Sequence, residues 1–297
     1  MRYRFVREYA QQFPIAALCR VLQVAKSGYY AWRRCPESRR AQANRALAAQ
    51  IKTAHGRSRK TYGRRRIHAQ LRQEGIPCSR HRVARLLRQE GLWGLRQRAF
   101  QVTTHSRHGL PAAPNRLLQS TPEGRARNFT APTPDQVWVS DLTYLACAEG
   151  WEYLATVMDL HSRRIVGWAM QSTLERSLTR RALGMAITQR RPRPGLIHHS
   201  DRGVQYACGD YQTALNEQGM IPSMSRPGDC WDNAPQESFF GTLQCELGLH
   251  ALRLPRAELR RNVFEYIEVF YNRQRLHSSL GYLSPATFEI QSAVKMA

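Results

Sequence analysis

Apolar residues in the first third of the chain recur at the three- and four-residue spacing of amphipathic helices. Segments 64–74 and 80–90 each carry one apolar stripe, and a short turn that contains Gly75 and ends at Ser79 joins them. Ser79 is a good N-cap for the second helix. Two helices joined by a tight turn with a glycine predict a helix-turn-helix. A plain helical hairpin with a solvated basic face is the alternative.

A further pair of short helices is predicted between residues 14 and 34, with a break at residues 26–28 that caps the second helix. After residue 136 the pattern changes to short β-rich runs separated by turn residues. We expect strands over 137–145, 153–159, 164–170, 195–199 and 221–225, and helices over 177–190, 209–218 and 256–273, with another helix around Glu237. This order of strands and helices predicts a mixed α/β domain.

These patterns divide the chain into four expected parts. They are a basic N-terminal helical segment (1–60), a helix-turn-helix-like domain (61–102), a basic linker rich in Thr, Pro, Ser, Asn and Arg (103–130), and the α/β domain (131–297).

Positive charge is concentrated upstream of the α/β domain. Residues 1–130 hold 28 Lys and Arg against 5 Asp and Glu, whereas residues 131–297 hold 17 of each. Such an excess favours a polyanionic partner, because binding releases the counterions of nucleic acid. Arg outnumbers Lys by 25 to 3 in the basic segment, which favours bidentate contacts to phosphate and guanine. The outward-facing Arg80, Arg82 and Arg85 are therefore candidate DNA contacts.

The seven cysteines form no Cys-x-x-Cys pair and have no regular spacing. This pattern argues against a zinc module and indicates a reduced, intracellular protein. No apolar run approaches the length of a membrane span, and the first residues do not lead into a signal peptide. We therefore expect a cytoplasmic protein with no membrane partner.

Three carboxylates stand in the densest motifs of the α/β domain. Asp141 lies within an expected strand, where a buried charge is costly unless a partner neutralises it. Asp201 ends a strand, and Glu237 stands near the start of a helix that Asp232 or Asn233 is expected to cap. Three convergent carboxylates suit two Mg²⁺ or Mn²⁺ ions near a phosphodiester, which points to metal-dependent cutting and joining of nucleic acid.

Three other residues near these acids have less specific patterns. His198 and His199 either orient a ligand or contact DNA, or they are structural residues at the end of a strand. Asp159 is expected to form a turn.

The chain closely resembles the second-frame products of insertion-sequence transposases of the IS-three family. The resemblance rests on the three acidic motifs and on residues 26–32 (KSGYYAW), 62–67 (YGRRRI) and 271–282 (YNRQRLHSSLGY). It implies an RNase H-like integrase core, a mixed five-stranded sheet with helices, after a small helical DNA-binding region. It also implies Asp141, Asp201 and Glu237 as the catalytic triad of a two-metal site, and Arg64, Arg65 and Arg66 are added to the candidate DNA contacts.

The activity implied by the resemblance is single-strand cleavage at the element ends, joining of the freed 3′ end, and integration into target DNA. The implied partners are DNA, further copies of the chain, and an upstream-frame product or frameshift fusion, at the nucleoid of a bacterial cytoplasm. Family members usually carry Lys or Arg seven residues after the glutamate, where this chain has Gln244. Gln244 is therefore a candidate DNA contact without charge.

Two rival functions fit the same residues. A DNA-binding regulator would occupy element ends without cutting them, and the uncharged Gln244 favours this alternative. A nuclease of the same fold would cut nucleic acid but would not join strands.

Overall fold

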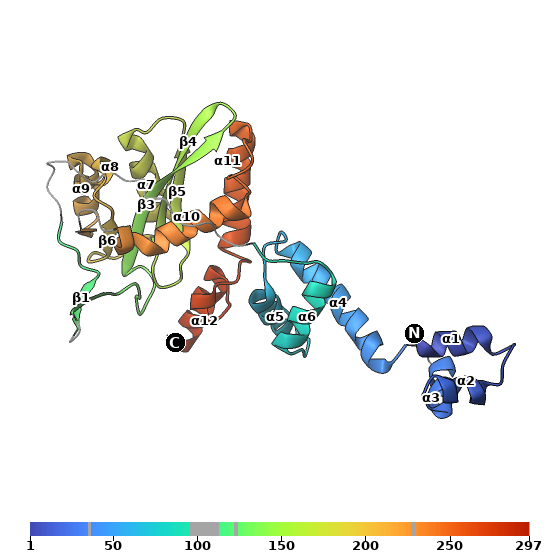
Figure 1. The fold of residues 1–297 in the computed structure, drawn as a ribbon. Helices are drawn as coiled ribbons and strands as arrows, with labels where there is room; N and C mark the ends of the chain where they lie inside the picture. The colour runs from blue at the N-terminus through green and yellow to red at the C-terminus, as the bar shows by residue number, and fades with distance from the viewer. Residues whose placement is uncertain (35–36, 96–112, 122–123, 227–229, 297) are drawn as a thin grey trace.

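The computed structural model describes residues 1–34, 37–95, 113–121, 124–226 and 230–296. Residues 96–102 of the expected helix-turn-helix-like domain and 103–112 of the expected linker lie outside them. Figure 1 shows a sheet covered by helices, a group of helices beside it, and a further small group at the far end of α4. Among the described residues, no helix is long and apolar enough to span a membrane.

The helices of the basic part are α1 (Arg2–Tyr9), α2 (Ile15–Val21), α3 (Lys26–Arg34), α4 (Arg39–Arg57), α5 (Arg64–Gln73) and α6 (Arg80–Gln89). A two-stranded antiparallel sheet follows, formed by β1 (Leu118–Thr121) and β2 (Gly124–Arg127). The α/β domain contains β3 (Val137–Cys147), β4 (Gly150–Asp159), β5 (Ile165–Gln171), α7 (Arg176–Arg190), β6 (Ile197–Ser200), α8 (Val204–Ala207), α9 (Gly209–Glu217), β7 (Ile221–Met224), α10 (Ala234–Glu246), α11 (Arg256–Phe264) and α12 (Pro285–Met296).

Five strands form one mixed sheet in the order β5-β4-β3-β6-β7. β3 pairs antiparallel with β4 from Trp138 opposite Asp159 to Cys147 opposite Gly150, and β4 pairs antiparallel with β5. β6 and β7 extend the sheet on the other side as parallel strands. The mixed α/β domain that the sequence pattern predicts is therefore confirmed.

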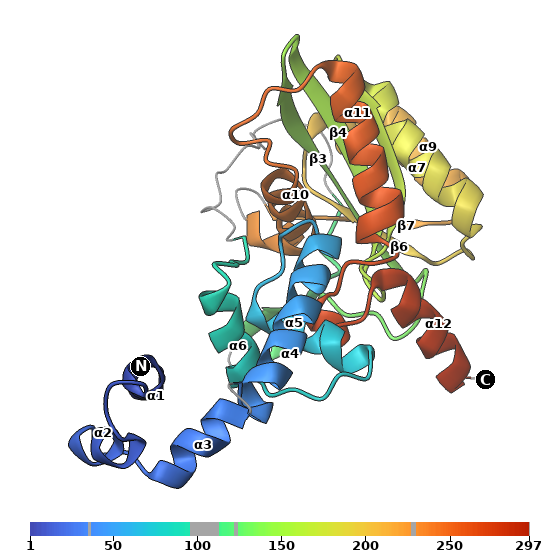
Figure 2. The ribbon, with the colours of Figure 1, turned by 90° about the vertical axis from the view of Figure 1, so that its right-hand side faces the viewer.

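Helices cover both faces of the sheet (Figures 1 and 2). On one face, α7 and α9 enclose a core that includes Trp138 and Leu183. On the other face, α10 and α11 enclose a second core that includes Val139, Leu243 and Tyr266. Trp138 and Val139 belong to different cores because successive side chains of a strand point to opposite faces.

The second core continues into α4, α5 and α6, which we call the helical unit. Ile51, Ile67 and Val83 contribute one buried side chain from each of its helices. Ser79 caps α6 as predicted, because its hydroxyl accepts a hydrogen bond of 3.3 Å from the amide of Arg82. The expected domain boundary at residue 60 stays a prediction, but α4 packs with α5 and α6 in one core.

Helices α1–α3 form a small core of their own around Val6, Cys19 and Tyr29. The sequence pattern does not predict α1, and the expected break at residues 26–28 is wrong, because α3 begins at Lys26. Gly28 lies inside α3, and the ring of Tyr3 from α1 packs against it. A glycine is needed at this position because a Cβ would overlap the Tyr3 hydroxyl.

The single long helix expected over 256–273 is also wrong. α11 is followed by a π-helix over Glu265–Tyr271, and the amide of Asn272 donates to the carbonyl of Ile267, five residues earlier. The wider turn places Asn272 against β5. There its side-chain amide exchanges two hydrogen bonds of 3.0 Å with the backbone of Ile165.

The helical unit docks on the side of the α/β domain that α10 and α11 cover. The hydroxyl of Tyr62 accepts a hydrogen bond of 2.6 Å from the amide of Leu276. The side chain of Gln73 donates a hydrogen bond of 2.7 Å to the carbonyl of Tyr282. Since the two parts also share one apolar core, they form a continuous packed body.

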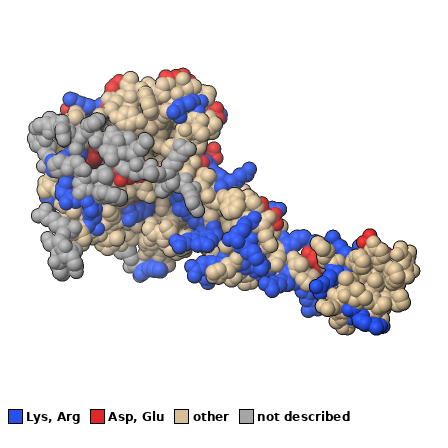
Figure 3. Space-filling model, in the orientation of Figure 1, with Lys and Arg blue, Asp and Glu red and all other residues tan. Residues whose placement is uncertain are grey.

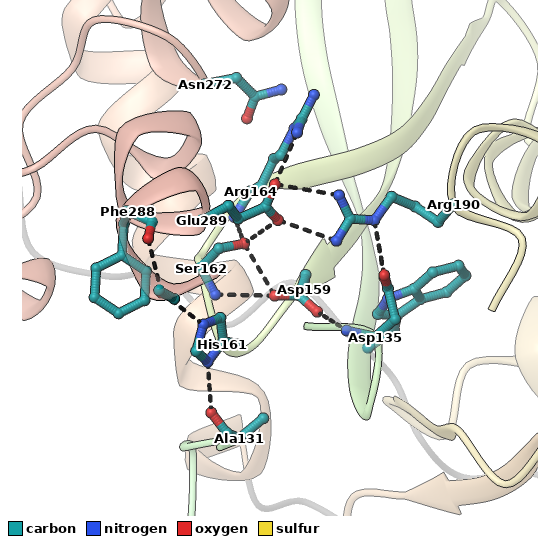
Figure 4. A network of polar contacts seen from close by, with 12 residues as sticks. Ala131, Asp135, Asp159, His161, Ser162, Arg164, Arg190, Asn272, Phe288 and Glu289 are labelled. Atoms are coloured by element: carbon teal, nitrogen blue, oxygen red, sulfur yellow. Dashed lines mark hydrogen bonds and ion pairs between the residues drawn. The ribbon is translucent and has the colours of Figure 1, made fainter. Parts of the chain in front are cut away.

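A buried polar network holds α12 on the sheet (Figure 4). Glu289 of α12 accepts hydrogen bonds of 2.8 Å from both Ser162 and Arg164, and Arg190 of α7 pairs with the same carboxylate. Asp159 accepts two hydrogen bonds of 2.9 Å from the backbone and the hydroxyl of Ser162. The expected turn at Asp159 is thereby confirmed.

We predict that Gly167→Ala destabilises the sheet domain by about 1–3 kcal/mol, the usual cost of overpacking a core. A Cβ at Gly167 of β5 would overlap the carbonyl oxygen of Ala182 and lie 2.7 Å from the backbone nitrogen of Ala186, both on α7. Equilibrium unfolding in urea measures the change in the free energy of unfolding.

The matched control is Gly184→Ala on α7, where a new Cβ meets no atom within 4 Å. This substitution should stabilise the protein by about 0.5–1 kcal/mol, because alanine is the better helix former. Equal effects of the two substitutions would show that the β5–α7 contact is not as close as described.

Candidate active site

Asp141 lies on β3 where this strand separates from β6. The pairing of β3 with β6 ends at Ser140, opposite Ser200. The Asp141 residue is 9% exposed, and one carboxylate oxygen accepts a hydrogen bond of 2.8 Å from the amide of Leu142. Its direct neighbour on β4 is Thr156. The Asp141 carboxylate is therefore buried in the sheet and poorly hydrated.

Asp201 directly follows β6, so the parallel pairing of β6 with β3 brings it beside Asp141. One oxygen of the Asp201 carboxylate accepts a hydrogen bond of 2.9 Å from the amide of Gly203. The two acids thus lie at the same end of two neighbouring strands, where loops gather and sites commonly form.

Glu237 is placed by the residue before it. Gln236 is fully buried, its amide nitrogen donates a hydrogen bond of 2.7 Å to the carbonyl of Val139, and its amide oxygen accepts one of 2.9 Å from the hydroxyl of Thr156. Because Thr156 is opposite Asp141, these bonds hold α10 over the face of the sheet that carries Asp141.

Two more amides hold α10 on β3. Asn233 donates a hydrogen bond of 3.1 Å to the carbonyl of Ser140, and Gln244 donates one of 3.1 Å to the hydroxyl of Thr143. The DNA contact expected of Gln244 stays a prediction. In the structure its amide joins α10 to the strand that carries Asp141.

Asn233 occupies the N-cap position of α10, as expected, but its side chain makes no capping hydrogen bond. Asp232 instead accepts hydrogen bonds from Arg127 at 2.7 Å and from Arg226 at 3.1 Å. Burial raises the pKa of Asp232, but the hydrogen bonds from Arg226 and Arg127 outweigh it and bring the pKa to about 2. Asp232 is therefore an anion that joins segments distant in sequence.

The three predicted acids influence each other electrostatically. Burial raises the pKa of Asp141 well above its usual range, and the charges of Asp201 and Glu237 raise it further, against the amide of Leu142, which lowers it. In the part of the chain that the structure describes, no three His, Cys, Asp or Glu side chains converge closely enough to form a metal site. The carboxylates are neighbours that repel, and two of them accept hydrogen bonds from nearby amides.

The residues around these acids suit a hard divalent cation. Carboxylate oxygens are the ligands that Mg²⁺ and Mn²⁺ prefer, and a cation would relieve the repulsion at Asp141. Tyr206 of α8 supports this fit, because its buried hydroxyl has no hydrogen-bond partner among the described residues. Burial raises the pKa of Tyr206, and the charges of Tyr211, Asp141 and Asp201 raise it further. An unsatisfied polar atom therefore lies near the acids.

His198 and His199 are structural residues of β6. His198 is 1% exposed and contacts the hydroxyls of Ser140 at 2.8 Å and Tyr211 at 3.1 Å. The other histidine contacts the hydroxyl of Ser223 at 2.9 Å. Burial lowers the pKa of His198 to about 3 and that of His199 to about 4. Of the two interpretations of these histidines, the buried and hydrogen-bonded one fits the structure.

A positively charged face lies on the helical unit. Figure 3 shows Lys and Arg gathered over this unit and along the chain toward α1–α3. Arg64 and Arg65 are exposed at the start of α5, and Arg80 and Arg85 are exposed on α6. These four predicted DNA contacts are thus accessible to a large partner.

A cleft of about 490 Å³ lies between α4 and α6 on this unit. Its lining residues are Arg40, Ala43, Ser79, His81, Arg82 and Arg85. Arg82 is held in place because its Nε donates a hydrogen bond of 2.8 Å to the side-chain oxygen of Asn44. The cleft therefore presents several cations next to the N-terminus of α6, an arrangement suited to phosphate.

Arg66 does not belong to the exposed basic face. Its guanidinium lies 5.5 Å from the centre of the Tyr62 ring, and its Nη1 lies 3.9 Å from Oε1 of Glu246. Burial and the charge of Arg275 lower its pKa. Arg66 is therefore part of the interface between the helical unit and α10, and the DNA contact expected of it stays a prediction.

The chain matches protein-family models over both of its parts. Residues 131–230 and 218–285 match two models described as integrase core domains, and residues 42–100 match one described as an HTH-like domain.

Relatives with known names match nearly the whole chain. It is 41% identical over 293 residues to the transposase InsF for insertion sequence IS3A of Escherichia coli strain K12, with 97% of this chain and 98% of that protein covered. It is 47% identical over 271 residues to the insertion element IS600 uncharacterized 31 kDa protein of Shigella sonnei, with coverages of 91% and 97%. The chain belongs to the family of insertion-sequence transposases that includes InsF. The family and the RNase H-like integrase core expected from the sequence are thereby confirmed, and the protein is a transposase of the polynucleotidyl transferase type.

Two solved structures resemble the transposase at low identity. The catalytic core domain of HTLV-2 integrase in complex with magnesium is 15% identical, with a TM-score of 0.43, and the match covers 53% of the transposase and 97% of that chain. The simian T-cell lymphotropic virus intasome in complex with PP2A regulatory subunit B56 gamma is 14% identical, with a TM-score of 0.46 and coverages of 81% and 74%.

Sequence reasoning missed the amide that places Glu237. Gln236 stands three and four residues before the buried Phe239 and Phe240, on the apolar face of α10. A polar residue at a core position of a helix is the signal that identifies it, because a buried amide needs hydrogen-bond partners.

We predict that the transposase loses stability as the pH falls below about 6.5. The reason is that His198 takes up a proton in the unfolded chain but stays neutral in the folded protein. The contribution of His198 is fully present above the unfolded pKa and is lost progressively down to its folded pKa of about 3. His198→Asn should therefore reduce the slope of the free energy of unfolding between pH 6 and 5 by about 1 kcal/mol per pH unit.

Urea unfolding across this range measures the slope, and His250→Asn at an exposed position is the matched control. An unchanged slope in His198→Asn would mean that His198 takes up its proton in the folded protein.

Proposed function

We propose that the transposase cleaves DNA at the ends of its insertion element and transfers the freed strand to target DNA, with Asp141, Asp201 and Glu237 as its catalytic acids. The observation that supports the proposal is the parallel pairing of β3 with β6, which ends next to Asp141 and Asp201, together with the hydrogen bond of Gln236 that holds α10 over β3. In a polynucleotidyl transferase, neighbouring carboxylates that can hold divalent cations are expected at the reacting phosphodiester.

Asp141, Asp201 and Glu237 would hold the divalent cations, Mg²⁺ or Mn²⁺, in a two-metal site. When bound, two such cations activate the attacking oxygen and stabilise the leaving oxygen of an in-line displacement at phosphorus. Asp141 would contribute its carboxylate from β3, the central strand of the sheet, which pairs with β4 on both sides of this residue. Gln236 and Asn233 fix α10 and thereby orient Glu237 toward the same space.

The helical unit would provide the grip on DNA. Its exposed arginines, Arg64, Arg65, Arg80 and Arg85, would contact phosphate or base edges, and the cleft beside Arg82 would accept a backbone phosphate. The docking of this unit on α10 would fix the bound DNA relative to the acids.

Strand transfer at two element ends needs more than one active site, so we propose that the transposase works as a homo-oligomer on DNA. A product of the upstream frame, either separate or fused by frameshifting, would join this assembly. Both proposals rest on the family of the chain and on the need to cut and join DNA at both ends of the insertion element.

A non-cutting regulator is the second candidate, and one observation favours it. Gln244, where the family resemblance implies a basic residue, uses its amide to bind Thr143 and brings no positive charge to the proposed site. Binding of element ends without metal-dependent nicking by the purified chain would support the regulator. Nicking without joining would support a nuclease.

We predict that Asp141→Asn, Asp201→Asn and Glu237→Gln each reduce metal-dependent nicking and joining by at least about a hundredfold and leave DNA binding unchanged. The substrate is a duplex with the terminal sequences of the element. The measurements are product formation with Mg²⁺ or Mn²⁺ and, separately, affinity without divalent cation.

Asp210→Asn and Glu217→Gln, which neutralise exposed acids of α9, are the matched controls and should keep full activity. Any triad variant that turns over near the parent rate would remove that acid from the proposed site.

We predict that Arg85→Gln weakens DNA binding and lowers the slope of log K against log salt concentration by about 0.9, the value for one phosphate contact. Arg193→Gln, which removes an exposed arginine of the α/β domain, is the control and should leave the slope unchanged. Filter binding or fluorescence anisotropy over a range of salt concentrations gives both slopes. An identical slope in Arg85→Gln and the parent would place the DNA away from α6.

A further inference from the structure

An aromatic cluster stands next to the proposed active site and has no role in the function derived so far. It consists of Tyr144 on β3 and of Trp151 and Tyr153 on β4. Tyr144 is 36% exposed and Trp151 is 54% exposed. Exposed aromatic groups of this kind mark binding surfaces more often than isolated surface residues do.

The cluster lies on a projecting part of the sheet. β3 continues from Asp141 to Cys147 after its pairing with β6 has ended, so this part of β3 pairs with β4 alone. Figures 1 and 2 show the β3–β4 hairpin extending past β6. The side of β3 that faces Asp201 is therefore open beyond the end of β6.

The rings are arranged as a corner. The ring centroids of Tyr144 and Tyr153 are 5.1 Å apart. Those of Tyr144 and Trp151 are 6.2 Å apart, and the planes of these two rings meet at 89°. A flat ring that stacks on one of these two side chains presents its edge to the face of the other, and both contacts are favourable for aromatic groups.

The cluster lies on the opposite face of β3 from Asp141, because side chains three residues apart on a strand point to opposite faces. Its link to the proposed catalytic acids is Asp201, which follows the end of β6, where the edge of β3 becomes open. Burial and the neighbouring Tyr153 raise the pKa of Tyr144, and the charge of Asp201 raises it further. The hydroxyl of Tyr144 therefore lies within electrostatic reach of an acid that we place at the reacting phosphodiester.

We propose that Tyr144, Trp151 and Tyr153 form a stacking surface for unpaired bases of the DNA strand that reacts at the acids. This inference rests on the proposed function, because it takes the acids as the place of the reacting phosphodiester. A strand that enters a protein active site must separate from its complement near the reacting bond, and that separation costs the stacking of the bases. Aromatic side chains replace this stacking without sequence preference, since every base has an aromatic face.

DNA fits this surface better than a second protein chain does. The transposase belongs to a family that acts on DNA, and the cluster lies on the part of β3 that continues beyond the end of β6, which Asp201 follows. An interface with a second copy of the chain is the competing occupant, and the experiment separates the two.

The test uses two duplexes, one blunt and one with a single-stranded overhang that carries a fluorescent adenine analogue, whose emission falls when it stacks. Binding is measured without divalent cation, so that no strand is cut. The full-length transposase should quench the overhang analogue. Trp151→Ala should abolish most of this quenching and weaken binding of the overhang duplex about tenfold, with no effect on the blunt duplex.

The matched control is Phe264→Ala, which removes a ring exposed to 53% on α11, close to the 54% of Trp151. It should leave quenching and affinity unchanged. Trp151→Phe keeps an aromatic face and should retain most of the quenching, which separates stacking from a general loss of structure. Tyr144→Ala should act in the same direction as Trp151→Ala.

Normal quenching and normal overhang affinity in Trp151→Ala would overturn the proposal. A change of oligomeric state in Trp151→Ala, measured by sedimentation, together with unchanged quenching, would also overturn it and would assign the cluster to an interface between copies. An error in the assignment of the catalytic acids would give a different result. The acid variants would then still cleave DNA, and the quenching by the parent protein and by Trp151→Ala would not change.

Discussion

The position of Glu237 depends on the buried amide of Gln236. This side chain is fully buried and bonds the carbonyl of Val139 and the hydroxyl of Thr156, which lie on two neighbouring strands around Asp141. A buried amide that loses its partners costs about 1–3 kcal/mol, so α10 cannot slide or rotate over the sheet without a substantial loss of stability. Glu237 is the next residue, and its geometry relative to Asp141 follows from these bonds.

The other end of α10 is fixed by charge. Glu246 accepts hydrogen bonds of 2.7 Å and 2.9 Å from Arg275 and one of 2.9 Å from the hydroxyl of Tyr266. Arg66 brings the helical unit to the same carboxylate. A buried ion pair of this kind is strongly destabilising when one partner is removed. The helix that carries Glu237 therefore contacts the sheet at one end and the basic helical unit at the other. A displacement of the helical unit would therefore also displace α10.

The sequence predicted the elements whose signal is local. The strands of the five-stranded sheet and the two helices of the helix-turn-helix were recognised because alternation, helical spacing and the cap at Ser79 are each contained in a few neighbouring residues. The strands β1 and β2 were missed, because they lie in the segment predicted to be a linker. The π-helix was missed because it depends on Asn272 meeting Ile165, far away in the chain. The role of Asp232 was missed for the same reason, since its partner Arg127 lies on β2. Local patterns cannot show which distant groups will satisfy a buried polar side chain.

The acids of the candidate site are held together against their own repulsion. A carboxyl whose pKa is raised in the folded state, such as Asp141, destabilises the fold at any pH above its unfolded pKa. A cation that binds the folded state alone restores this stability by mass action. The same repulsion acts on a DNA phosphate that approaches the acids, whereas the arginines of the helical unit attract it. The distribution of charge in the chain would therefore favour DNA binding at the helical unit, and divalent cations at the acids would lower the repulsion of the reacting phosphate.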